Sequence, residues 1–120
     1  MSKRKIKIEV GCFYIAYGGN PHPAFVYEKT KYGTYKAIKT GTTNSKEMVE
    51  ITSLEGNCKK QYANKRPFEG TKKDFGKKLL GLTINNDDLI TINEIKKRKS
   101  KKSRRAKEAY LKYKKMPSSD

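Results

Sequence analysis

The sequence predicts a mainly β fold, a small barrel of about five strands followed by a basic C-terminal helix. Short apolar runs of strand length, separated by Gly, Pro and Asn loops, fill the first two thirds of the chain. Hydrophobic residues make up 34% of the 120 residues and charged residues equal them, so one domain with a small core is expected. Residues 96–115 carry +11 of the net charge of +17. We therefore divide the chain into a β-barrel domain over residues 1–95 and a basic helical or disordered tail over residues 96–120.

The first strand is expected over residues 6–17. Its apolar side chains fall on both parities after Gly11, which indicates a bend at that glycine and burial on both faces, as in small closed barrels. A Gly-Gly-Asn-Pro loop follows. The same pattern of apolar runs and turn residues predicts the other strands over residues 23–29, 34–40, 47–54 and 79–84.

A long polar and basic segment, residues 55–78, separates the last two of these strands. A compact domain seldom keeps an unstructured connection of this length unless the connection is functional. Within it, basic residues alternate with Phe68 and Phe75, the mixture that binds phosphates and stacked bases in single-stranded nucleic acids. The alternative is that both phenylalanines anchor the segment to the core, while its lysines still bind RNA.

The signals become helical from residue 86 onward. The Asn-Asp-Asp run at 86–88 suits a helix N-terminus, and apolar residues then recur at three-residue spacing at Leu89, Ile92 and Ile95. The β-branched run at 90–92 favours instead a short strand, with a helix starting near Thr91. We expect the helix. Residues 96–105 have no apolar face, but a short stripe at Ala106, Ala109, Tyr110 and Tyr113 allows the end to dock back or to fold on a partner.

The concentration of positive charge makes nucleic acid the expected partner. Such a field attracts polyanions, and each Lys or Arg that neutralises a phosphate releases a condensed counterion. The alternative is a solvated, disordered tail. No apolar run has the length of a membrane span and no secretory segment follows the basic start, so a cytoplasmic protein without membrane contact is expected.

The two cysteines predict neither a metal site nor a disulfide framework. Cys12 and Cys58 stand 46 positions apart, with no His beside either. Cys12 lies in an apolar run and is expected to be a small buried side chain. We expect no cofactor.

His22, the only histidine, lies between two prolines immediately before a predicted strand. Imidazole can take or give a proton near neutral pH, which cleavage of a phosphodiester by the 2′-hydroxyl requires at two points. The alternative is a loop histidine without a task, since one histidine is no constellation.

Residues 40–46, at the end of the third predicted strand, combine several hydroxyls with an amide, a glycine and a lysine. Such groups can cradle a phosphate by hydrogen bonds and charge. The alternative is an ordinary polar turn, and the spacing is not that of a Walker-type phosphate loop.

Residues 11–43 place a glycine before an apolar-aromatic strand, His22-Pro23 at the start of a second strand, and Thr42-Thr43 after a third. Over about residues 10–45 this order resembles the opening of MazF/PemK-type toxins. The resemblance implies an SH3-like barrel that cleaves RNA without a metal. It also implies restraint by an acidic protein antitoxin or, in related toxins, by an RNA antitoxin, and assembly as a homodimer.

The chain departs from that family at one important position. The catalytic arginine before the proline is replaced by His22, which cannot clamp a phosphate with a bidentate fork. If the resemblance holds, His22 is the general acid or base and Thr42 and Thr43 hold the scissile phosphate. The candidates for binding nucleic acid are basic and hydroxyl side chains of the loops and tail: Lys36, Thr40, Lys46, Lys65, Arg66, Lys72, Lys73, Lys97, Arg98, Arg104 and Arg105.

The sequence therefore predicts a metal-independent endoribonuclease of the toxin type. The alternative is a non-catalytic RNA- or DNA-binding barrel from a phage or mobile element. A third class, an inhibitor or structural component that clamps another nucleoprotein, also stays open.

Overall fold

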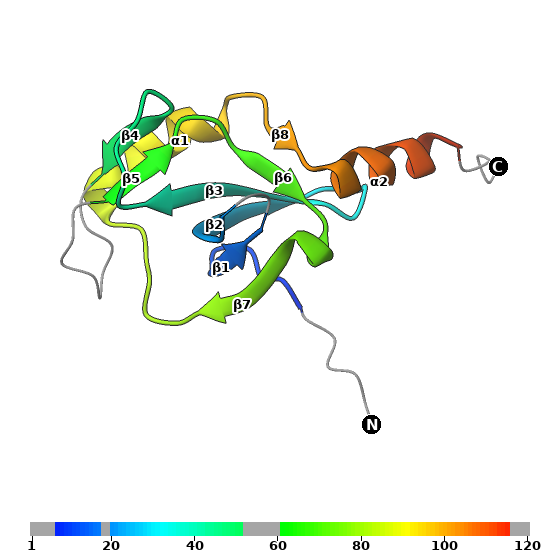
Figure 1. Cartoon of the computed structure of the whole chain (residues 1–120), viewed down its shortest axis with the longest axis horizontal. Coiled ribbons are helices and arrows are strands. Elements are labelled where there is room, and N and C mark those ends of the chain that lie inside the picture. Colours follow the sequence, from blue (N-terminus) through cyan, green and yellow to red (C-terminus); the bar gives the residue numbers. More distant parts are fainter. Residues whose placement is uncertain (1–6, 18–19, 52–60, 116–120) are drawn as a thin grey trace.

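A computed structural model describes residues 7–17, 20–51 and 61–115 of the chain (Figure 1). Within these residues the fold is mainly β, which confirms the predicted class. The strands are β1 (Phe13–Ala16), β2 (His22–Lys29), β3 (Tyr35–Gly41), β4 (Met48–Ile51), β5 (Gln61–Asn64), β6 (Phe68–Gly70), β7 (Phe75–Leu79) and β8 (Lys101–Lys102). The helices are α1 (Leu89–Lys96) and α2 (Arg104–Lys115), with 3-10 turns η1 (Lys72–Asp74) and η2 (Asn86–Asp88).

The described strands form one sheet in the order β4-β5-β3-β2-β1-β7. Strand β3 lies at the centre of the sheet. One of its edges pairs with β2, and the other pairs with β6 along its first half and with β5 at its end. The short β8 adds to β6 in parallel, whereas the other pairings are antiparallel. Strands β4 and β7 are the ends of this path, so the sheet is open along the described residues.

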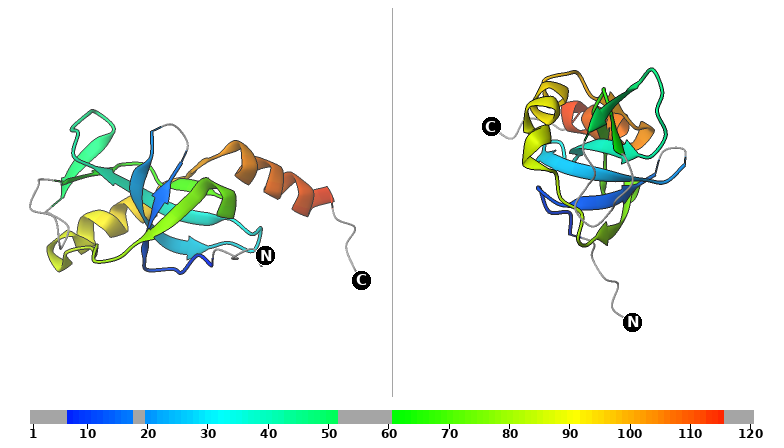
Figure 2. Two further views of the ribbon diagram at one scale, coloured as in Figure 1. Left: turned by 60° about the horizontal axis from the view of Figure 1, so that its bottom comes forward. Right: turned by 90° about the vertical axis from the view of Figure 1, so that its left-hand side faces the viewer.

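Neighbouring residues of the central strands point into two different cores. Tyr14 and Ala37 belong to a cluster with Phe68 and Phe75, while Phe13 and Ile38 belong to a second cluster with Ile92 and Ile95 of α1. Burial on both faces explains why the apolar residues of β1 follow no single parity. Helix α1 therefore covers one face of the sheet, as Figure 2 shows.

The first strands follow the sequence prediction closely. Strand β2 begins one residue earlier than expected, and β3 begins and ends one residue later. The chain bends at Gly11 with a φ of 93°, as predicted. Strand β1 is shorter than expected and begins only after this bend. Ile6 and residues 52–54 of the predicted first and fourth strands lie outside the described residues.

The expectation of an unstructured segment over residues 55–78 is wrong for residues 61–78, which contain β5, β6, η1 and most of β7. Phe68 and Phe75 are 9% and 2% exposed and their rings pack edge to face, with centroids 5.8 Å apart. They anchor the segment to the core and are not available to stack on bases. Residues 55–60, with Cys58, lie outside the described residues.

The strand predicted over residues 79–84 is displaced toward the N-terminus. It ends at Leu79, because Leu80 is 82% exposed and Gly81, with a φ of 84°, turns the chain away from the sheet.

The helix expected after residue 86 is confirmed. Asn85 accepts a hydrogen bond from the Asp87 backbone N–H, η2 follows, and α1 begins at Leu89 with Ile92 and Ile95 buried.

The C-terminal arm, residues 97–115, packs against β6 and η1 (Figure 1). Ala106 is fully buried and the ring of Tyr110 stacks on Tyr32, with centroids 3.9 Å apart. The arm is also held by two buried carboxylates. Glu69 accepts hydrogen bonds from Ser100 and Tyr110 of the arm, and Asp74 accepts from Ser103 and Arg105.

Half-buried Cys12 is a free thiol packed against the first core cluster. None of the described helices combines the length and the apolar character that crossing a membrane requires.

Candidate nucleic-acid interface

His22 and the threonines that follow β3 meet at one surface pocket, the His22 pocket. Strands β2 and β3 are antiparallel, with Ala24 opposite Lys39, so the first residue of β2 faces the last residue of β3. A Cβ placed on Gly41 would come 3.5 Å from His22 Nδ1, which shows that the imidazole lies against this glycine. The pocket has a volume of about 390 Å³ and is lined by His22, Pro23, Gly41, Thr42, Thr43, Ser45, Met48 and Gln61.

The chemistry of this pocket is that of proton transfer and hydrogen bonding. Exposed His22 can exchange a proton, and the hydroxyls of Thr42, Thr43 and Ser45 can donate hydrogen bonds to an oxyanion. Among the described residues that line it there is no Lys or Arg, so within the described ranges any neutralisation of a bound phosphate has to come from outside the pocket.

Thr40 was predicted to contact nucleic acid, but its side chain turns inward. It is 1% exposed, and its hydroxyl donates a hydrogen bond of 3.3 Å to the Pro23 carbonyl. Thr40 therefore ties β3 to the start of β2, beneath the His22 pocket, and its hydroxyl is not offered to a ligand.

A second pocket, the Lys39 pocket, lies beyond the segment 45–48. Ser45 and Met48 line the His22 pocket, whereas Lys46 and Glu47 line the Lys39 pocket, so this segment separates the two. The Lys39 pocket has a volume of about 360 Å³, and five cations and one carboxylate are among its lining residues, which are Lys39, Lys46, Glu47, Asn64, Lys65, Arg66, Pro67, Phe68 and Lys101. Three predicted residues, Lys46, Lys65 and Arg66, are thus brought together here.

Lys39 is half-buried, with its ammonium 4.3 Å from the centroid of the Phe68 ring. Burial, together with the nearby charge of Lys101, lowers the pKa of Lys39, although Asp74 opposes this shift. The ammonium group lies in a positive environment that disfavours its own charge.

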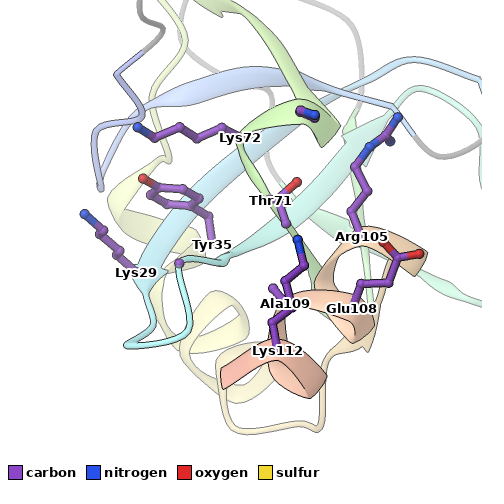
Figure 3. Close-up of a pocket in the computed structure, with 10 residues that line it drawn as sticks. Lys29, Tyr35, Thr71, Lys72, Arg105, Glu108, Ala109 and Lys112 are labelled. Atoms are coloured by element: carbon purple, nitrogen blue, oxygen red, sulfur yellow. The ribbon is translucent and has the colours of Figure 1, made fainter. Parts of the chain in front are cut away.

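A third basic hollow, the arm groove, lies between the β2–β3 hairpin, η1 and α2 (Figure 3). Its volume is about 570 Å³, and it is lined by Lys29, Gly33, Tyr35, Thr71, Lys72, Lys73, Arg105, Glu108, Ala109 and Lys112. It brings together three further predicted residues, Lys72, Lys73 and Arg105. Arg105 is already paired, because its Nη1 lies 3.1 Å from the buried carboxylate of Asp74.

The other predicted binding residues do not gather at one place. Lys36 pairs with Glu28 at 3.7 Å, and Lys97 pairs with Glu94 at 3.5 Å. Arg98 lines a pocket between β4 and α1, and Arg104 is exposed at the start of α2.

Sequence reasoning missed Lys39, Lys101 and Gln61. Lys39 lies within an apolar strand and Gln61 in a segment expected to be a loop. Lys101 reaches the Lys39 pocket because the two-residue β8 pairs with β6, and a strand this short leaves no periodic signal in the sequence.

Among the described residues no group of three or more His, Cys, Asp or Glu side chains could hold a metal ion. Comparisons with protein-family models, with curated proteins and with solved structures found no match for the chain.

Proposed function

We propose that the protein is a metal-independent endoribonuclease of the toxin type, which cleaves RNA by attack of the 2′-hydroxyl on the adjacent phosphate. The observation that carries the proposal is the His22 pocket, where the imidazole and the hydroxyls of Thr42 and Thr43 line one hollow. These are the groups that this chemistry needs, a proton acceptor beside donors for the phosphate oxygens.

Each group has a defined task in this proposal. His22 takes the proton of the 2′-hydroxyl while the 2′-oxygen bonds to phosphorus, and the bond from phosphorus to the 5′-oxygen breaks. The leaving oxygen takes a proton from water, and the products are a 2′,3′-cyclic phosphate and a 5′-hydroxyl. Thr42 and Thr43 donate hydrogen bonds to the non-bridging oxygens, where negative charge grows.

The MazF/PemK-type resemblance and its SH3-like barrel belong to the same proposal. A barrel is supported by the path of the chain around η1. Strand β6 pairs with β3, β7 pairs with β1, and η1 joins β6 to β7, so the chain crosses between these two edges of the sheet. An acidic protein antitoxin or an RNA antitoxin is the partner that this proposal implies, and the toxin itself would be a homodimer.

The test is incubation of the pure protein with a mixed RNA ladder in EDTA. Wild type should leave cyclic-phosphate ends, and His22→Ala and Thr42→Ala/Thr43→Ala should lose about 10²–10⁴-fold in cleavage rate. Asn93→Ala, at an exposed position of α1, is the matched control and should cleave like wild type. Equal cleavage by wild type and His22→Ala would exclude the role given to the imidazole.

A second candidate is RNA or DNA binding without cleavage. The described lining of the His22 pocket favours it, because that lining holds no Lys or Arg, whereas described cations line the Lys39 pocket and the arm groove. Salt-sensitive binding by wild type, with no cleavage by any of the proteins in the same experiment, would establish this function.

A further inference from the structure

We infer that the Lys39 pocket binds a phosphate group, supplied by the backbone of an RNA strand whose neighbouring nucleotide occupies the His22 pocket. The inference rests on the proposed action on RNA and names a site that supplies positive charge, which the described lining residues of the His22 pocket do not. Four observations carry it.

The first observation is the excess of charge. Five cations, Lys39, Lys46, Lys65, Arg66 and Lys101, face one hollow, and Glu47 is the only carboxylate among its described lining residues. A concave site lined by one sign of charge concentrates ions of the opposite sign. Its volume of about 360 Å³ lies in the range of about 300–1,000 Å³ typical of ligand sites, which suffices for a phosphodiester.

The second observation is that three segments are joined into a fixed rim. Lys65 Nζ donates a hydrogen bond of 2.9 Å to the Lys46 carbonyl, and Lys65 N–H donates one of 2.8 Å to the Glu47 carbonyl. The Nε of Arg66 donates to the Lys99 carbonyl at 3.2 Å, and Lys101 N–H donates to the Pro67 carbonyl at 2.8 Å. These bonds fix the chain around the cations before any ligand arrives, which lowers the entropy cost of binding.

The third observation is that Lys39 and Arg66 have no carboxylate partner within the part of the chain that the structure describes. No acidic oxygen of the described residues lies within ion-pair distance of Lys39 or Arg66, in contrast to Lys36, Lys97 and Arg105. The bond of Arg66 Nε leaves its two terminal nitrogens to form the fork that matches phosphate. A phosphate oxygen beside Lys39 would remove the repulsion between Lys39 and Lys101.

The fourth observation is the shared wall. The two ends of segment 45–48, Ser45 and Met48, line the His22 pocket, and its middle residues, Lys46 and Glu47, line the Lys39 pocket, so an RNA strand that crosses this segment places adjacent backbone groups in both. Free phosphate could enter the Lys39 pocket but could not reach across segment 45–48 into the His22 pocket. A polynucleotide is therefore the source of phosphate that the arrangement favours.

The test measures binding of a labelled single-stranded oligoribonucleotide to the full chain in the His22→Ala background, so that cleavage cannot interfere. Arg66→Gln and Lys39→Gln should each weaken binding about fivefold at low salt and lower the slope of log affinity against log salt by about 0.7. Lys77→Gln removes the same charge from an exposed position on β7, at the opposite edge of the sheet, and should change affinity less than about twofold.

Two further measurements keep the result interpretable. Thermal unfolding checks each variant, and Lys101→Gln, at an exposed position, replaces Lys39→Gln if the half-buried site does not tolerate the amide. NMR of lysine side chains compares the oligoribonucleotide with inorganic phosphate, and the Lys39 signal should shift with RNA at much lower concentrations. A shift with inorganic phosphate alone would overturn the assignment to RNA.

The outcomes separate this site from the proposed catalysis. If wild type cleaves RNA while Lys39→Gln, Arg66→Gln and Lys101→Gln bind like Lys77→Gln, the phosphate site is rejected and the ribonuclease stands. If wild type does not cleave but these variants still lose affinity, the phosphate site stands and the ribonuclease is rejected.

Discussion

Glu69 is a fully buried carboxylate in a chain whose surface is dominated by lysine and arginine. Its Oε2 accepts hydrogen bonds from Thr34 at 2.6 Å and Tyr110 at 2.5 Å, and its Oε1 accepts one from Ser100 at 2.7 Å. A buried charge costs several kcal/mol unless such bonds satisfy it. Burial, together with the hydrogen bond to Glu69, raises the pKa of Tyr110 to about 12, so its hydroxyl keeps its proton as a donor at neutral pH.

Replacing Glu69 by Gln should lower the free energy of unfolding by about 2–3 kcal/mol at pH 7, because an amide NH₂ cannot accept from the hydroxyls that face it. Urea unfolding followed by circular dichroism measures this change. Glu108→Gln, at an exposed position on α2, is the control and should change stability by less than about 0.5 kcal/mol. Equal stability of the two variants would contradict the role given to Glu69.

The pH dependence of stability tests the same carboxylate in the wild type. Burial raises the pKa of Glu69, but the hydrogen bonds from Thr34, Tyr110 and Ser100 outweigh burial and hold the pKa below its ordinary value of 4.5. In acid the unfolded chain therefore binds more protons at Glu69 than the folded chain does. The contribution of Glu69 to the free energy of unfolding is complete above pH 4.5 and is lost as the pH falls through the lower pKa of the folded state. Wild type should lose more stability than Glu69→Gln below pH 4.5, and parallel curves would contradict this expectation.

Gly70 has no room for a side chain. A Cβ at this position would come 2.7 Å from the Cβ of Asp74, whose carboxylate anchors the arm through Ser103 and Arg105. Gly70→Ala should lower the free energy of unfolding by about 1–3 kcal/mol. Gly33→Ala also strains a positive φ but meets no atom within 4 Å, so a larger loss at Gly33 than at Gly70 in thermal unfolding would contradict the steric explanation.

At the residue level, the sequence predicted that His22 meets Thr42 and Thr43 but not the anchors of the arm. Two antiparallel strands joined by a short turn must bring His22 to the end of the next strand, so its meeting with Thr42 and Thr43 follows from chain order. Glu69 and Asp74 are single acids within a basic stretch, and nothing in their spacing shows that they are buried. Apart from Thr71, which donates to Asp74 from three residues away, their side-chain donors in Thr34, Ser100, Ser103, Arg105 and Tyr110 lie 29 to 41 residues away along the chain.

The arm is the element whose role changes most from the sequence to the structure. Its charge predicted a tail that binds nucleic acid, with a solvated, disordered tail as the alternative, and only the short apolar stripe from Ala106 to Tyr113 allowed its end to dock back. In the structure, Ser100, Ser103 and Tyr110 satisfy buried carboxylates and β8 extends the sheet. These contacts are polar and long-range, and the hydrophobic periodicity that identifies helices and strands in a sequence does not report them.

Deleting residues 96–120 should therefore do more than weaken RNA binding. It leaves Glu69 and Asp74 buried without their donors from the arm, so the truncated chain should unfold at a lower temperature than the full chain. Neutralising only exposed arm charges, as in Arg104→Gln/Lys107→Gln, should keep the unfolding temperature and lower the salt dependence of RNA binding. A truncated chain as stable as the full one would contradict the docking of the arm.

The described residues form two apolar cores on opposite faces of one sheet, and the full chain carries a net charge of +17. The mainly β class was predictable because short apolar runs alternate with turn residues. The sequence could not predict which side chains belong to which core, because residues of both parities are apolar in β1 and β3. The open sheet path, with β6 beside β5 on one edge of β3, depends on pairings between distant segments.

Self-repulsion of this charge should make stability depend on ionic strength. The midpoint of thermal unfolding should rise as sodium chloride increases from about 0.05 to 0.2 M, because salt screens like charges. Single-stranded RNA should raise it further at equal ionic strength, through binding to the folded state alone. The control is sucrose, which stabilises without screening, and a midpoint that falls with salt would contradict the electrostatic explanation.

The buried carboxylate also constrains the order in which the chain can fold. Thr34 is made before Glu69, but Ser100 and Tyr110 follow it by 31 and 41 residues. A chain still under synthesis can pair β1, β2 and β3 while the Glu69 side chain remains hydrated, because enclosing it without its last donors costs more than it gains. Closure of the domain is thus delayed until the arm has left the ribosome, and a nascent chain holds neither the Lys101 side of the Lys39 pocket nor the α2 side of the arm groove.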